Sequence, residues 1–267
     1  MKSIWSVARI TFTEAIRDRI LYSLILFAIV MILSSLIFAS ISAEQYNKIV
    51  KDLGLTVISL MGIIISVFLG MGLVYKEIEK KTVYNIFSKP IRRYEFIVGK
   101  YLGLSFTVLV NTLAMALILA LIVLYIEFKH GGIIKYYYGG PYHSQFFKAV
   151  YFEYLEFLVV IGIALVFSSF TTPVMTLLFT FFLFAIGRFS SDIRLLAEQV
   201  KDPIIGYITQ FLYRVIPNLE KFDVRSEAVY GGDIGWTLIL YTTAYALIYT
   251  IVLLILSIVI FQKREFK

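Results

Sequence analysis

Long apolar runs alternate with polar segments along most of this chain. Six of the runs hold about the 20 residues that an α-helix needs to cross roughly 30 Å of hydrocarbon. They lie near residues 20–41, 53–75, 101–126, 149–170, 172–190 and 237–261. Pro173 suits the first turn of a helix, so the fourth and fifth runs should form a tight hairpin. The pattern predicts an all-α polytopic membrane protein with six transmembrane helices, organised as a single domain over residues 1–267.

The segment before the first run, residues 3–19, has apolar side chains on one helical face and polar side chains on another. The two sets are Trp5, Ala8, Phe12 and Ile16, and Arg9, Thr13 and Arg17. This spacing predicts an interfacial amphipathic helix on the cytoplasmic leaflet. A cleaved secretory signal is the alternative, but the apolar run that follows is longer than the about 7–15 residues typical of such signals.

Two further amphipathic stretches lie in residues 191–217, before the last run. Apolar residues recur at helical spacing ahead of Pro203 and again ahead of Pro217, which predicts two short helices that each end at a proline. The second stretch holds the residues of a possible outer gate, namely Ile204, Ile208, Phe211 and Leu212. These helices could lie on the outer surface or dip partly inward, where protein or a water-filled cavity would have to cover their backbone.

A charged island at residues 76–100 separates the second and third apolar runs. It contains seven of the chain's 25 Lys and Arg residues, and the N-terminal segment and the C-terminal tail are basic as well. The loops of the opposite side, including residues 188–236, have a lower density of basic residues. Because Lys and Arg gather in cytoplasmic loops, the distribution predicts that both termini and the island are cytoplasmic.

The composition fits a chain embedded in lipid. Hydrophobic residues make up 60% and charged residues 16%, and the mean hydropathy is +0.84. A net charge of +7 could suggest nucleic acid as a partner. However, the basic residues flank the apolar runs, so orientation in the bilayer and contact with membrane lipid explain the charge better, and we expect no nucleic-acid partner.

Residue types that carry catalysis or bind metals are scarce. The chain has no cysteine, which excludes disulfides, thiolate metal sites and cysteine nucleophiles. The two histidines, His130 and His143, lie in a loop rich in Gly and Tyr, residues 127–148, and are expected at the surface. No phosphate-binding sequence of the type Gly-x-x-x-x-Gly-Lys-Ser/Thr occurs. We therefore expect no catalytic residue, metal site or cofactor site in this chain.

Few polar residues fall inside the predicted spans. Asn111 is the most polar residue well inside a span, while Glu153, Glu156 and Arg188 are expected at the outer ends of spans. Carriers driven by a proton relay need ionisable groups near the middle of the bilayer, so such a carrier is disfavoured. Energy for transport would then come from elsewhere, and the island at 76–100 is the segment suited to receive it.

Glycines occur at two places suited to close helix contacts. Gly70-Met71-Gly72 lies inside an apolar run and indicates helix packing rather than nucleotide binding. Gly99 and Gly103 have the small-residue spacing that lets two helix backbones approach each other. A close contact with another helix is the favoured interpretation for this pair, and dimerisation is the alternative.

A specific pattern runs through the island and into the third span. It reads Glu79-x-x-Thr82, then Ser88-Lys89-Pro90-Ile91-x-Arg93-x-Glu95-Phe96-x-x-Gly99-Lys100-Tyr101-x-Gly103. This pattern resembles the loop between spans two and three of ABC-2 type transporter permeases, although Lys81 stands where many relatives have Gly. Ile216-Pro217-Asn218-Leu219-Glu220-x-Phe222-Asp223 resembles the branch that includes the permease for copper-enzyme maturation in nitrous-oxide reduction.

The resemblance implies the transmembrane permease subunit of an ATP-driven ABC exporter in a prokaryotic inner membrane. Two permease copies would pair as a homodimer, and each would dock on a cytoplasmic ABC ATPase subunit that holds ATP and Mg. The island would supply the coupling helix to that ATPase. The implied coupling residues are Glu77, Glu79, Lys80, Thr82, Ser88, Pro90, Arg92, Arg93 and Glu95.

Other classes of function remain open from the residues themselves. The chain could be a membrane scaffold or assembly factor for an enzyme-maturation system, without transport. It could also be an embedded lipid-modifying enzyme, which the lack of clustered acids or histidines argues against. The island could be a solvated, positively charged loop with no partner.

Overall fold

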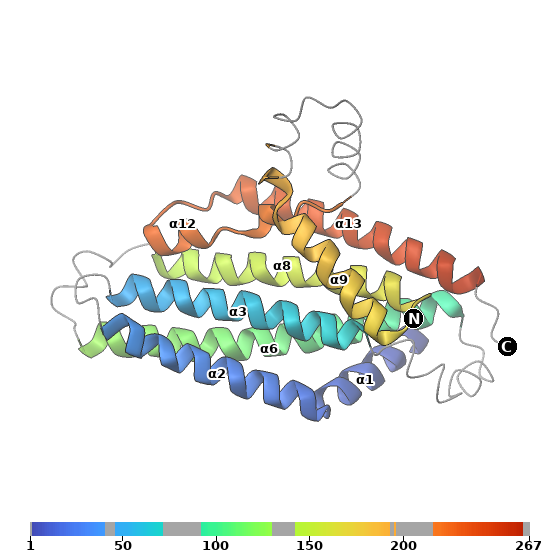
Figure 1. The fold of residues 1–267 in the computed structure, drawn as a ribbon, viewed down its shortest axis with the longest axis horizontal. Coiled ribbons are helices and arrows are strands. Elements are labelled where there is room, and N and C mark those ends of the chain that lie inside the picture. Colours follow the sequence, from blue (N-terminus) through green and yellow to red (C-terminus); the bar gives the residue numbers. More distant parts are fainter. Residues whose placement is uncertain are drawn as a thin grey trace.

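The computed structural model describes residues 2–40, 46–71, 92–129, 142–192, 195 and 216–263. Every regular element in these ranges is helical, which confirms the predicted all-α class (Figure 1). The elements are α1 (Lys2–Ile16), α2 (Arg19–Ser40), α3 (Tyr46–Met71), α6 (Arg93–Lys129), α8 (Tyr142–Ser168), α9 (Pro173–Arg188), η1 (Leu219–Phe222), α12 (Arg225–Tyr230) and α13 (Trp236–Lys263).

Five of these helices are long and apolar enough to cross a membrane, namely α2, α3, α6, α8 and α13. They match five of the six predicted spans. The predicted span at 172–190 corresponds to α9, which has 16 residues and is shorter than the roughly 20 that a full crossing needs. The count of six spans therefore stays a prediction.

The turn between α8 and α9 is tight, as the sequence predicts. Pro173 occupies the first turn of α9, and extended backbone at Thr172 precedes it. The hydroxyl oxygens of Thr171 and Thr176 lie 2.8 Å apart across the turn. Ser169 contacts Ser257 of α13 through their hydroxyl oxygens at 2.8 Å, so the hairpin is also joined to the last helix.

Helix α8 lies at the centre of the bundle (Figure 1). Of the residues in its most apolar stretch, 78% are buried, against 22% for both α2 and α13. Phe152 and Phe157 of α8 are fully buried. Small residues allow this packing: a Cβ placed on Gly70 of α3 would lie 2.3 Å from the Cβ of Ala164, which confirms the predicted close contact at Gly70.

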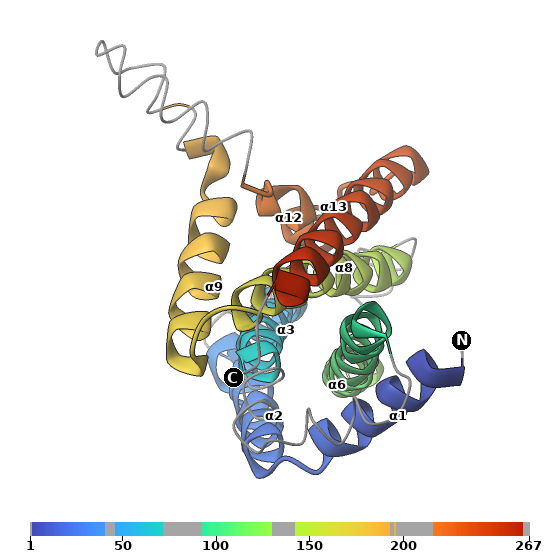
Figure 2. The same cartoon turned by 90° about the vertical axis from the view of Figure 1, so that its right-hand side faces the viewer.

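The pair Gly99 and Gly103 forms the contact between α6 and α1, which lie side by side (Figure 2). A Cβ on Gly103 would lie 2.6 Å from the carbonyl oxygen of Ala8, and a Cβ on Gly99 would lie 2.7 Å from the Cβ of Val7. The structure thus confirms a close helix contact here, and its partner is α1 of the same chain.

The predicted amphipathic helix forms as α1, but its buried face is rotated from the expected one. The buried residues are Val7, Ala8, Thr11 and Ala15. Trp5, expected on the apolar face with Ala8, is 72% exposed. The reason is that the glycines of α6 accept small side chains and backbone at close range, whereas a tryptophan would not fit there.

Residues 216–235, here called the α12 segment, do not span the bundle but pack against it. Seven apolar side chains of the segment are buried, namely Ile216, Leu219, Phe222, Val224, Ala228, Val229 and Ile234. Figure 1 places α12 toward the end of the bundle opposite to the start of α1 and the end of α13. The two amphipathic helices predicted before Pro203 and Pro217 fall almost wholly outside the described residues.

Replacing Gly103 with leucine should separate α1 from α6, because the new side chain would collide with backbone at Ala8 that cannot move aside cheaply. Overpacking of this kind costs about 1–3 kcal/mol. We expect a lower midpoint of thermal unfolding for Gly103→Leu in detergent. Gly235→Leu is the matched control, since a Cβ there meets its nearest neighbour only at 3.7 Å. Equal midpoints for the two variants would contradict the packing described here.

Candidate functional site

Three of the nine implied coupling residues lie in the described part of the chain, and they open helix α6. They are Arg92, Arg93 and Glu95. The other six lie outside the described residues, namely Glu77, Glu79, Lys80, Thr82, Ser88 and Pro90. The possible gate residues Ile204, Ile208, Phe211 and Leu212 also lie outside them.

Helix α6 begins at a well-defined cap. The backbone N–H of Arg92 donates to a carboxylate oxygen of Glu95 at 3.0 Å. The carbonyl oxygen of Arg92 in turn accepts from the N–H groups of Glu95 and Phe96. This is half of a capping box, and the negative charge of Glu95 also suits the positive end of the helix dipole. The start of α6 is therefore fixed by its own residues.

Arg93 joins the start of α6 to the end of α13. Its Nη1 donates to the carbonyl oxygens of Phe261 at 3.1 Å and Gln262 at 2.8 Å. These carbonyls belong to the last turn of α13, where the helix itself offers no N–H partners. Phe96 stacks on Phe261 with ring centroids 5.8 Å apart, so apolar contact supports the hydrogen bonds.

Lys100 differs from the solvated lysine that the charged island suggests. It is buried, and its ammonium lies 5.0 Å from the centroid of the Phe96 ring, within the range of a cation–π contact. The preceding residue, Gly99, packs closely against α1. The first two turns of α6 therefore contact α1 and α13 together, and we call this meeting point the α6 junction.

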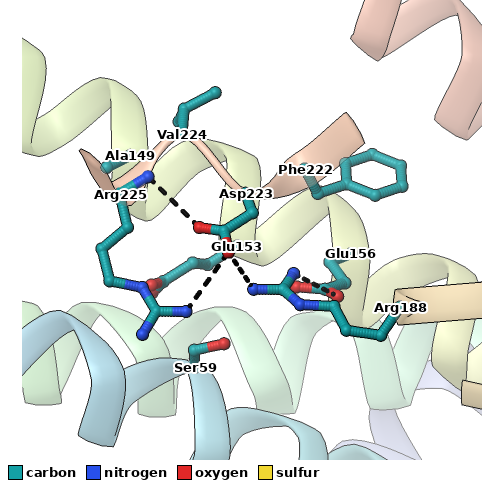
Figure 3. Close-up of a pocket in the computed structure, with 9 residues that line it drawn as sticks. All are labelled: Ser59, Ala149, Glu153, Glu156, Arg188, Phe222, Asp223, Val224 and Arg225. Atoms are coloured by element: carbon teal, nitrogen blue, oxygen red, sulfur yellow. Dashed lines mark hydrogen bonds and ion pairs between the residues drawn. The ribbon is translucent and has the colours of Figure 1, made fainter. Parts of the chain in front are cut away.

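A second group of polar residues lies on the other side of α8, under the α12 segment (Figure 3). Arg188, at the end of α9, is its centre. Its Nη1 contacts a carboxylate oxygen of Glu156 at 3.1 Å, and its Nη2 contacts a carboxylate oxygen of Asp223. One guanidinium thus holds α8, α9 and the α12 segment together.

Arg225 extends this group toward α3. Its Nη2 lies 3.5 Å from a carboxylate oxygen of Asp223, and its Nη1 donates to the hydroxyl oxygen of Thr56 at 2.7 Å. Ser59 of α3 and Glu153 of α8 complete the polar part of the lining. We call the five charged residues Glu153, Glu156, Arg188, Asp223 and Arg225 the buried charge cluster, after its two buried glutamates. Its two arginines are half-buried, and Asp223 is exposed.

The start of α8 differs from the sequence prediction, whereas the depth of its two glutamates in a membrane stays a prediction. Glu153 and Glu156 were expected at the outer end of the fourth span, taken to begin at residue 149. Helix α8 begins at Tyr142, so both glutamates lie near its middle. The helix can start early because its first polar residues find protein partners in the α12 segment.

Those partners are residues that precede α13. Gln145 donates from its side-chain nitrogen to a carboxylate oxygen of Asp233 at 2.8 Å and accepts from the N–H of Ile234 at 3.2 Å. Lys148 donates to the carbonyl oxygen of Ile234 at 2.6 Å. The α12 segment is therefore fastened to α8 at two places, one near Asp223 and one near Asp233.

Sequence reasoning named Glu153, Glu156 and Arg188 but did not bring them together. It missed the contacts of Asp223 and Arg225, which stand in a polar stretch that gives no local sign of them. The one available signal was that Glu153 and Glu156 are spaced three residues apart and so lie on one face of a helix. Among the described residues, no group of three or more His, Asp or Glu side chains is placed to hold a metal ion.

Replacing Arg188 with methionine should strongly destabilise the fold. It leaves Glu156, which is fully buried, without its cationic partner. Breaking a buried ion pair from one side costs about 3–5 kcal/mol. We expect a clear fall in the free energy of unfolding in detergent for Arg188→Met. Arg9→Met, at an exposed site on α1, serves as the control. A difference from wild type no larger than that of Arg9→Met would show that the pair contributes little.

The sequence was also compared with known proteins. A family model described as ABC-2 family transporter protein matches residues 5–266. No curated protein matches the chain.

Proposed function

This chain belongs to the ABC-2 family of transporter proteins, and on that premise we propose that it works with a separate cytoplasmic ABC ATPase subunit to move a substrate across a membrane. The chain is the permease of that ABC transporter and a multi-pass membrane protein. ATP and Mg would bind to the partner subunit, since this chain lacks a phosphate-binding loop. A non-transporting scaffold is the alternative, and it predicts no dependence on ATP turnover.

The α6 junction is the observation that carries this proposal. In the sequence, the charged residues 76–91 immediately precede the capped start of α6. A force applied to that loop reaches a helix end that is held to α13 by Arg93 and to α1 at Gly99. A plain connecting loop has no need of such contacts, whereas a coupling loop does.

The coupling surface toward the ATPase would be formed by the loop before α6. Glu77, Glu79 and Lys80 can meet charges on the partner, and Thr82 can cap a short helix there. Ser88 and Pro90 would separate that helix from α6. Arg92 is exposed at the start of α6 and is available to the partner, while Arg93 and Glu95 support the junction.

The shared position of the basic segments supports a cytoplasmic location for this end. The start of α6, the end of α13 and α1 lie together, and all three adjoin the basic segments that the charge distribution assigns to the cytoplasm. We place the protein in a prokaryotic inner membrane, with a second copy as partner. The exposed apolar faces of α2 and α13 can meet lipid or that second copy.

Opposite-side labelling tests this topology. The chain has no cysteine, so single cysteines can be placed at Glu265 in the tail and at Ser226 in the α12 segment. We expect an impermeant thiol reagent added outside intact cells to modify Ser226→Cys and to spare Glu265→Cys. Lysis should expose Glu265→Cys. Labelling of both sites from outside, or the reverse pattern, would defeat the assignment.

Arg93→Gln tests coupling directly. Loss of two hydrogen bonds from a charged donor should release the end of α13 from α6. We expect the ATPase subunit still to co-purify, because Arg93 faces α13, but ATP-driven transport to fall. Arg9→Gln removes the same charge from an exposed site on α1 and should behave as wild type. Unchanged transport by Arg93→Gln, with the ATPase bound, would argue against the junction as the path of coupling.

The proposal that a separate ATPase subunit powers transport has its own test. The purified permease alone should not hydrolyse ATP above a mock preparation, and hydrolysis should appear with the co-purified ATPase subunit. Substrate transport that continues without any ATPase would overturn the proposal and would favour a carrier of another class.

A further inference from the structure

Glu153 is the one charged side chain of the buried charge cluster for which the structure gives no ion pair. It is 6% exposed, and its Oε2 has no hydrogen-bond partner. The two guanidiniums beside it bind other groups: Arg188 holds Glu156 and Asp223, and Arg225 holds Asp223 and Thr56. A carboxyl in the middle of an apolar bundle therefore lacks the partner that a charge would require.

The charges of the cluster do not balance if every group is ionised. It has three carboxyls and two guanidiniums. Asp223 is exposed and can be hydrated, whereas Glu153 and Glu156 are buried and only Glu156 has a direct ion pair. Burying an unpaired charge is far more costly than burying a neutral group, and a buried group takes its neutral form instead.

The space beside Glu153 restricts what could supply the missing positive charge. The cavity lined by the cluster has essentially no volume (about 0 Å³) that a water-sized sphere could occupy. A water molecule needs about 10–15 Å³ on the same measure, and a metal ion with oxygen ligands has no room either. A proton on the carboxyl needs no such space.

We propose that Glu153 is a proton-binding site that is loaded while the α12 segment lies against α8 and that releases its proton when the segment separates. On separation, water reaches the carboxyl, the bond between Oε2 and hydrogen breaks, and the proton passes to that water. The carboxylate left behind is then hydrated. This inference goes beyond the proposed function, because it needs neither the ATPase nor a transported substrate.

The groups that face Glu153 come from four elements. They are Glu156 of α8, Arg188 of α9, Asp223 and Arg225 of the α12 segment, and the neutral Ser59 of α3. Arg188 and Arg225 are already engaged, so they do not supply a dedicated partner. When the α12 segment leaves, Asp223 and Arg225 leave with it, and the environment of Glu153 changes from enclosed to wet.

The sign of the pH dependence follows from this arrangement. The closed arrangement binds a proton that the separated arrangement releases, so low pH favours the closed arrangement. As the pH rises above the value at which hydrated Glu153 ionises, closure has to take up a proton from solution and becomes progressively less favourable. The Glu153→Gln variant mimics the protonated carboxyl and should remove this dependence.

Infrared spectroscopy of the purified full chain tests the bound proton. We expect wild type at neutral pH to show a C=O stretching band of a protonated carboxyl that is lost in Glu153→Gln. The band should remain in Glu14→Gln, a matched change at an exposed site on α1. A spectrum of Glu153→Gln identical to wild type would overturn the proposal. So would loss of the band in Glu156→Gln together with its retention in Glu153→Gln.

Cysteine labelling tests the link to the α12 segment and does not depend on the infrared result. Ala228→Cys lies on the buried face of the segment, while Ser226→Cys lies on its exposed face and reports the intrinsic effect of pH on thiol reactivity. We expect the labelling of Ala228→Cys relative to Ser226→Cys to rise with pH, and to stay low and flat once Glu153→Gln is added. A ratio that does not change with pH, or that rises equally with Glu153→Gln present, would show that no proton is linked to the segment.

Discussion

The contact of Arg188 with Glu156 and Asp223 is the interaction on which the packing of the α12 segment depends. Glu156 is fully buried, and a buried charge is tolerated only when it is paired and hydrogen-bonded, so its contact with Arg188 fixes the place of both side chains. Asp223 contacts the same guanidinium from the exposed side. Because the three residues belong to α8, α9 and the α12 segment, their pairing determines how α9 ends and how the segment returns over α8. Lys148 and Gln145 then fasten the far end of the same segment just before α13 begins.

The α6 junction joins α6 to α1 and α13 at the other end of the bundle. Its contacts are close backbone packing at Gly99 and Gly103, and hydrogen bonds from Arg93 to the last carbonyls of α13. Helix α13 connects the two regions. At its start, the ring centroid of Trp236 lies 5.7 Å from the ammonium nitrogen of Lys148. Near its end, Phe261 stacks on Phe96. A displacement of the junction therefore has a direct helical path to the α12 segment.

The helical class, the hairpin at Pro173 and the close contact at Gly99 and Gly103 could all be predicted, because each depends on local pattern and spacing. The partner of those glycines could not, since a small-residue pair shows that a helix approaches but not which one. The contacts of Asp223 with Arg188 and of Arg225 with Thr56 could not be predicted either, because they depend on the return of the α12 segment over α8 rather than on neighbouring residues. The apolar face of α1 was misjudged at Trp5 for the same reason: the shape of α6 decides which face is buried.

The central claim is that the start of α6, α1 and the end of α13 move as one body when ATP acts on the permease. Distances between spin labels test this most directly, with labels on cysteines placed at the exposed positions Trp5, Gln262 and Ser226 of the complex in membranes. The account predicts that the distance from Trp5 to Gln262 stays the same with and without nucleotide, while the distance from Gln262 to Ser226 changes. A change between Trp5 and Gln262, or no change in either distance, would contradict it.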